Sequence, residues 1–365
     1  GGSEVVTLRQ AQIDVRMKRP DEALAKIDQL RKAGKGSAAA ENLAILILEE
    51  QGKKQEARDL LQEARKQYPK AVDLVGLEAA LLNRDKKPEE AQEVLKKYLE
   101  GEPDNVTLTV LRAQILNDEL KRPDDAREIL KALAERSDNS APLVQLAQID
   151  MEHDNLEAAA ETIGKIRSRW KESATGDILD GQLALKRKSI PAARDHFAEA
   201  LRKDPSNKVV QFWKAQLDSR SGSVTEAAKA LESLVRNRPT KEIDTGVSLM
   251  TAAQSALANL ELQTGKLDEA IRRYEELKRN SENGTLSRSD RWQLITAYVA
   301  KDQWPIARRE LAAILNDAKN PPTSDERVRG ANLYRQQKET APAVAQLDYV
   351  LKNNPAHPSA VIVRS

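Results

Sequence analysis

KRPDEA, residues 18–23, is the stretch on which the interpretation of this sequence rests. Equivalent stretches occupy residues 53–57, 86–91 and 121–126, and each has cations first, then one or more acids, then an alanine. Cations are favoured at the C-terminal end of a helix and acids at the N-terminal end, and proline is tolerated in a first helical turn. Each stretch therefore predicts a tight turn between two antiparallel helices.

The alanine that ends this stretch recurs along the whole chain. Successive alanines are 34, 34, 35, 33, 34, 34, 43, 37 and 36 residues apart. We call them the elbow alanines: Ala23, Ala57, Ala91, Ala126, Ala159, Ala193, Ala227, Ala270, Ala307 and Ala343. Because a period near 34 residues is typical of helical repeat arrays, the spacing predicts about ten helical hairpins.

Apolar residues around each elbow alanine follow a helical spacing. Four and seven residues after it, every hairpin carries an apolar residue, such as Ile27 and Leu30, which places both on one face of a second helix. Twelve residues after it, five hairpins carry proline, and twelve residues before it, seven carry a small residue such as Ala11 or Gly181 in the first helix. This pattern resembles the tetratricopeptide repeat.

The resemblance implies an all-α fold, a right-handed superhelical solenoid of antiparallel helix-turn-helix repeats, with a groove lined mainly by first helices. We expect repeats 1–7 in residues 1–239, repeats 8–10 in residues 240–357, and the start of a further helix at residues 358–365. The 43-residue interval sets this division. A longer first helix or an inserted loop accounts for it, and it marks either a tolerated insertion or a break in the superhelix.

Composition narrows the classes of function. The net charge is only +2 with acids and bases interleaved, which disfavours nucleic acid as a partner. The lack of cysteine excludes disulfides, thiolate metal sites and cysteine nucleophiles, and it favours a bacterial envelope or periplasmic location over the cytoplasm.

The longest apolar run, residues 43–48, is too short to span a bilayer. Residues 1–3 resemble a cloning remnant, so we expect the natural chain to extend further.

Catalytic and cofactor chemistry is not expected. The three histidines, His153, His196 and His357, lie in different repeats, and no glycine-rich phosphate-binding motif occurs. Some tetratricopeptide proteins bind acidic C-termini of chaperones through a lysine one turn before an asparagine in a first helix, and no first helix here has that lysine. We therefore expect no enzyme, no metal, no cofactor and no such clamp.

An amide column provides the candidate binding site. Directly after the small residue of the first helix, seven repeats carry an amide: Gln12, Gln114, Gln148, Gln182, Gln216, Asn259 and Asn332. Since an amide both donates and accepts, the column suits the backbone of an extended peptide. The alternative is that these amides bond neighbouring helices or water. Phe212, Trp213 and Trp292 are further candidates, either as partner anchors or as core residues.

These patterns favour a non-enzymatic protein-interaction scaffold that binds a peptide or protein in the groove of first helices. The alternative is a docking or assembly segment of a larger bacterial envelope, secretion or exopolysaccharide-type machine. Neither the partner nor the oligomeric state follows from the sequence.

Overall fold

The computed structural model shows an all-α repeat solenoid and describes residues 2–236, 245–281 and 284–364. Within these ranges it contains α-helices, one π-helix and no strand.

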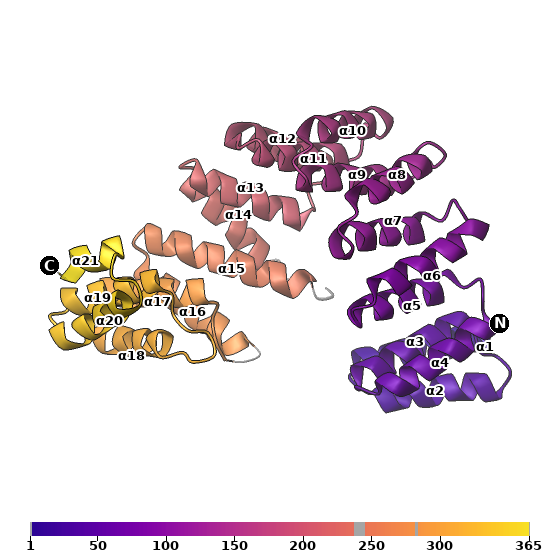
Figure 1. The fold of residues 1–365 in the computed structure, drawn as a ribbon, viewed down its shortest axis with the longest axis horizontal. Helices are drawn as coiled ribbons and strands as arrows, with labels where there is room; N and C mark the ends of the chain where they lie inside the picture. Colours follow the sequence, from indigo (N-terminus) through magenta and orange to yellow (C-terminus); the bar gives the residue numbers. More distant parts are fainter. Residues whose placement is uncertain (1, 237–244, 282–283, 365) are drawn as a thin grey trace. The chain divides into compact units, whose positions relative to one another are not determined.

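The chain divides into two compact units, Gly1–Lys188 and Ser189–Ser365, which are considered separately below. The helices of unit 1 are α1 (Gly2–Arg16), α2 (Pro20–Lys32), α3 (Ala38–Glu50), α4 (Lys54–Gln67), α5 (Val72–Arg84), α6 (Pro88–Gly101), α7 (Val106–Gln114), the π-helix η1 (Ile115–Glu119), α8 (Pro123–Ala134), α9 (Ala141–Glu152), α10 (Leu156–Arg169) and α11 (Thr175–Lys186) (Figure 1).

Unit 2 continues the same alternation of first and second helices. Its helices are α12 (Ile190–Lys203), α13 (Lys208–Arg220), α14 (Val224–Arg236), α15 (Thr245–Gln263), α16 (Leu267–Asn280), α17 (Arg288–Ala300), α18 (Trp304–Leu315), α19 (Ser324–Gln336), α20 (Thr340–Asn353) and α21 (Pro358–Arg364). In both units each helix packs on the next one along the chain. No helix in the described ranges has the length and apolar character needed to cross a membrane.

The elbow alanines lie where the sequence predicts, at the close approach of the two helices. All ten are buried, and so are all ten residues that follow them at the fourth position. At the seventh position Tyr98 is half-buried and its hydroxyl donates to the Lys70 carbonyl, whereas the other nine are buried. Burial of these faces against neighbouring helices is the main source of helix stability in such arrays.

A left-handed residue ends the first helix of every repeat. It stands five positions before the elbow alanine and has a φ between 54° and 89° in all ten repeats: Lys18, Gly52, Lys86, Lys121, Asp154, Lys188, Gly222, Gly265, Asp302 and Lys338. In the first repeat the Lys18 amide donates to the Val15 carbonyl and the Arg19 amide to the Asp14 carbonyl, the two bonds of a Schellman motif. Seven repeats therefore place a side chain where glycine fits better.

The π-helix explains the 35-residue interval before Ala126. Its turn lies between the small residue Ala113 and the elbow, where the Leu120 amide donates to the Ile115 carbonyl and the Arg122 amide to the Leu116 carbonyl. A widened turn absorbs one additional residue without moving the faces on either side of it. Both Ala113 and Ala126 consequently remain buried.

The long interval before Ala270 is partly explained by α15, which has 19 residues. A longer first helix was one of the two arrangements expected there. The predicted boundary at residues 239 and 240 lies outside the described residues, so the division into repeats 1–7 and 8–10 stays a prediction. At the other end, α21 packs on α19 and α20 in the position of a further first helix.

Buried aspartates of first helices pair with arginines of the preceding second helices. Asp150 of α9 accepts from Nε of Arg127 of α8 at 2.7 Å, and Asp218 of α13 accepts from Nε of Arg194 of α12 at 2.9 Å and also pairs with Lys214. Both arginines directly follow an elbow alanine. Because a buried carboxylate needs a partner, each pair helps to fix how one repeat stacks on the next.

Candidate partner-binding surface

Successive first helices pack on one another in both units. In unit 1, α1 packs on α3, α3 on α5, α5 on α7, α7 on α9 and α9 on α11; in unit 2, α13 packs on α15, α15 on α17 and α19 on α21. In the part of the chain that the structure describes, successive second helices do not pack on each other to a comparable extent. Each unit therefore has a first-helix face, made of adjoining helices, and a second-helix face, whose helices stand further apart.

The amide column lies on the solvent side of the first helices. Gln12, Gln148 and Gln216 are exposed, and Gln114, Gln182, Asn259 and Asn332 are half-buried. The preceding small residue is buried in each case, and one residue further along a helix turns the side chain by about 100° away from the core. None of the seven amides is buried.

One amide of the column is bonded within the protein. Gln114 Nε2 donates to Gln145 Oε1 on the next first helix at 3.1 Å. This bond shows that amides on neighbouring first helices come within hydrogen-bonding distance of each other. Gln182 belongs to unit 1 and Gln216 to unit 2, so a single stripe through both stays a prediction.

The three aromatic candidates contribute to packing. Phe212 is 8% exposed and Trp292 is 4% exposed, so both rings are buried. Trp213 is half-buried, with its ring centroid 5.6 Å from that of Phe197. The structure therefore assigns them the packing role that was one of the two interpretations of their position.

A polar network surrounds Trp292 in unit 2. The indole Nε1 donates to Glu326 at 2.9 Å, and Arg288 Nε donates to the same carboxylate oxygen at 2.6 Å. Burial raises the pKa of Glu326, but the hydrogen bonds from Arg288, the Thr323 backbone amide and the indole outweigh it and lower that pKa to about 2. Glu326 is thus a fixed anion that holds α17 and α19 together.

Arg329 of α19 lies beside Trp292. Its guanidinium carbon lies 4.5 Å from the ring centroid of Trp292, and Nη2 donates to Thr296 Oγ1 at 3.2 Å. Thr296 holds the position that the amides occupy in other repeats, and Arg329 is exposed. An oriented, exposed guanidinium therefore adjoins the amide column on the first-helix face.

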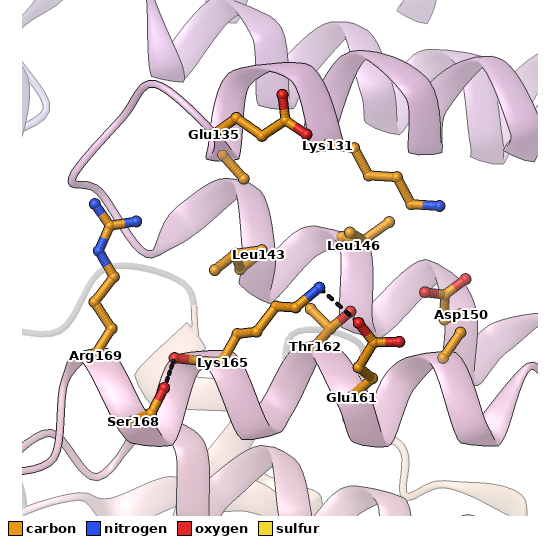
Figure 2. A pocket seen from close by; sticks show the side chains of 12 residues that line it. Lys131, Glu135, Leu143, Leu146, Asp150, Glu161, Thr162, Lys165, Ser168 and Arg169 are labelled. Atoms are coloured by element: carbon orange, nitrogen blue, oxygen red, sulfur yellow. Dashed lines mark hydrogen bonds and ion pairs between the residues drawn. The ribbon is translucent and has the colours of Figure 1, made fainter.

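Grooves open on the second-helix face of unit 1. Each lies between two second helices, with a first helix as its floor. Their volumes are about 320 Å³ between α2 and α4, about 490 Å³ between α4 and α6, and about 780 Å³ between α8 and α10. Figure 2 shows the largest groove, with charged side chains from α8 and α10 on its two rims.

Two of the three histidines lie beside polar partners within the protein. His153 Nε2 lies 2.8 Å from the amide oxygen of the buried Asn117, whose nitrogen donates to Glu152 at 2.8 Å. His357 is 3.4 Å from Asp325. Among the described side chains no group of three or more metal-ligating residues could hold a metal ion.

Comparison with known proteins agrees with this geometry. A tetratricopeptide repeat profile matches residues 8–72, 80–142, 144–208 and 213–285. The chain belongs to the tetratricopeptide repeat family. Repeats of this family generally form protein–protein interaction scaffolds and are typically non-catalytic. No curated protein matches the chain.

Solved tetratricopeptide structures share the fold at low sequence identity. The human IFIT1 dimer with PPP-AAAA is 16% identical, with 94% of this chain and 81% of that chain covered and a TM-score of 0.52. The same human protein with m7Gppp-AAAA is also 16% identical, with 97% and 80% covered and a TM-score of 0.53. A tetratricopeptide repeat protein from Parabacteroides merdae is 14% identical, with 84% and 100% covered and a TM-score of 0.46. At this identity the two IFIT1 likenesses show the fold alone, and the third, with a TM-score below 0.5, carries no argument.

Proposed function

We propose that this chain is a non-enzymatic scaffold that binds an extended segment of a partner protein along its first-helix face. The observation that carries the proposal is the amide column, of which no member is buried. Neighbouring packed helices stand about 8–10 Å apart, and an extended chain rises about 3.3 Å per residue. Where successive first helices each carry an amide, as α7, α9 and α11 do, the amides therefore match about every third residue of a bound strand.

The amides suit a peptide backbone better than a phosphate backbone. An amide pairs equally with N–H and C=O groups, which alternate along a peptide. Binding to nucleic acid depends mainly on cations that neutralise phosphates, whereas this chain has a net charge of only +2. The IFIT1 structures are named with the ligands PPP-AAAA and m7Gppp-AAAA, so the test also includes binding to RNA.

The test uses peptides selected by the unmodified chain from a displayed library of random 12-residue segments. Their dissociation constants are then measured by fluorescence anisotropy against a variant with Gln148 and Gln182, which lie on the neighbouring first helices α9 and α11, replaced by alanine. We expect binding to weaken at least tenfold. The melting temperature should stay nearly constant, because side chains that are not buried contribute little to folding.

A matched control makes the same substitution at Gln29 and Gln62, which are exposed on second helices. Equal affinity of the first-helix and control variants for the selected peptides would contradict the proposal. So would a chain that selects no peptide but binds a 20-nucleotide RNA with a strong dependence on salt.

A further inference from the structure

The largest of these three grooves has a mainly apolar floor. It lies between α8 and α10, and Leu143 and Leu146 of α9, both less than a tenth exposed, form most of its base, which also includes the buried Asp150 paired with Arg127. Thr162 is also buried there, and Ala134 and Ala158 are the short side chains of its walls. Figure 2 shows the two leucines between the charged residues of the two rims.

Other junctions between repeats of unit 1 are filled by an arginine at this place. Arg31 donates from Nε and Nη2 to Glu41, at 2.9 and 2.6 Å, within the groove between α2 and α4. Arg65 donates from Nε to Glu78 at 2.8 Å within the groove between α4 and α6. Arg167 of α10 donates from Nη1 to Asp180 of α11, the following first helix, at 3.1 Å.

The groove between α8 and α10 lacks this arginine–acid pair. Each of those arginines stands eight residues after its elbow alanine, where the fourth repeat has Ala134. The positions equivalent to Glu41 and Glu78 are Leu143 and Leu146. Ala134 is the smallest residue of its column, which otherwise reads Arg31, Arg65, Leu99, Arg167, Leu201, Val235, Lys278, Leu315 and Leu351. An apolar space thus stands where Arg31, Arg65 and Arg167 form ion pairs in their own repeats.

The charges on the rims indicate what the space receives. Lys165 pairs with Glu161 at 2.7 Å, and Arg169 pairs with Asp138. Lys131 is on α8, and Glu135, four residues further along, directly follows the last residue of that helix; among the described residues neither has an ion-pair partner. The rim therefore offers one cation and one anion that are four residues apart. An acid and a base four residues apart on another helix have the same spacing.

We propose that this groove binds an amphipathic helix of a partner protein, which inserts one large aliphatic side chain over Leu143 and Leu146. An acid and a base, four residues apart on that helix, pair with Lys131 and Glu135. The volume of about 780 Å³ lies in the range of ligand-binding sites, and an amphipathic helix in a groove is an established mode of recognition. The site lies on second helices and does not depend on the first-helix face.

The probe is a synthetic, fluorescein-labelled helical peptide of 18 residues with one leucine beside a glutamate and a lysine that are four residues apart. A second peptide carries alanine in place of the leucine. We expect the leucine peptide to bind the full chain at least tenfold more tightly and to shift the methyl resonances of Leu143 and Leu146. No binding, or equal affinity of the two peptides, overturns the proposal.

Two variants close the groove with residues that this chain uses at the same position. Ala134→Leu copies Leu99, and Ala134→Arg combined with Leu143→Glu copies Arg31 and Glu41. Each is expected to weaken the peptide at least tenfold while the melting temperature stays close to that of the parent. Ala132→Leu, an exposed site on the same helix, is the matched control and should leave binding unchanged.

Charge reversal tests the orientation of the bound helix. Glu135→Lys should weaken binding about three- to tenfold, and a peptide with glutamate in place of its lysine should restore it. Unchanged affinity in both groove-closing variants would overturn the proposal. So would a parent chain that self-associates in solution while Ala134→Leu is monomeric, because a second copy would then be the occupant.

Discussion

Replacing Lys86 with glycine is expected to stabilise unit 1 although it removes a side chain. Lys86 ends α5 with a φ of 63°, and Gly52 holds the equivalent position in the preceding repeat with a φ of 76°. Lys86 is exposed, so its side chain contributes little packing. The substitution therefore isolates the cost of holding an L-residue in a left-handed conformation.

The magnitude follows from three opposing contributions. The left-handed conformation costs an L-residue about 1–2 kcal/mol, and glycine avoids this cost. Glycine loses about 0.5–1 kcal/mol through the greater freedom of the unfolded chain, and removal of a cation near a helix C-terminus costs a few tenths more. We expect a net gain of about 0.5 kcal/mol at Lys86, and about 1.5 kcal/mol when Lys18 and Lys121 are replaced as well, because each lies in a different hairpin.

Urea unfolding followed by circular dichroism measures the gain, and hydrogen exchange of α5 and α6 localises it, since repeat arrays do not always unfold in one step. The adjacent Lys87→Gly is the control. Lys87 has a φ of −119° and pairs with Glu90 at 3.0 Å, so glycine there should destabilise. If Lys86→Gly lowers stability as much as Lys87→Gly does, the assignment of strain to the left-handed position is refuted.

Further predictions concern packing and pH. Ala91→Leu and Ala193→Leu should each destabilise by about 1–3 kcal/mol, because both elbow alanines are fully buried and added methylenes have no space; parental melting temperatures would contradict this. Glu326 has a folded pKa of about 2, below its ordinary 4.5, so its contribution is present above about pH 4.5 and is lost as the pH falls toward 2. Glu326→Gln should therefore destabilise unit 2 by about 2–3 kcal/mol at pH 6 and progressively less below pH 4.5, measured by tryptophan fluorescence; a difference that does not depend on pH would contradict the assignment.

Much of the candidate surface could be anticipated from spacing alone. The amide column follows from its offset of one residue from a buried small residue, which turns it out of the core, and the structure leaves all seven amides unburied. The aromatic residues are different. Phe212 and Trp292 stand three residues before the small position, and whether such a residue faces solvent depends on what the neighbouring helix carries. In the structure α19 supplies Glu326 and Arg329 around Trp292.

The amino-acid sequence by itself determined the hairpins, their number and their buried faces. These features repeat about every 34 residues. A helix face that is buried in every repeat appears in the sequence as apolar residues at a fixed spacing. The tertiary structure alone decided the features that depend on a single residue in its surroundings. The left-handed position is glycine in only three of ten repeats, so the residue type does not identify it. The only sign of the π-helix in the sequence is one additional residue before Ala126. The groove at Ala134 is open because its repeat lacks the arginine–acid pair that Arg31 and Arg65 form. Such a pair joins two repeats, and only packing brings its two residues together.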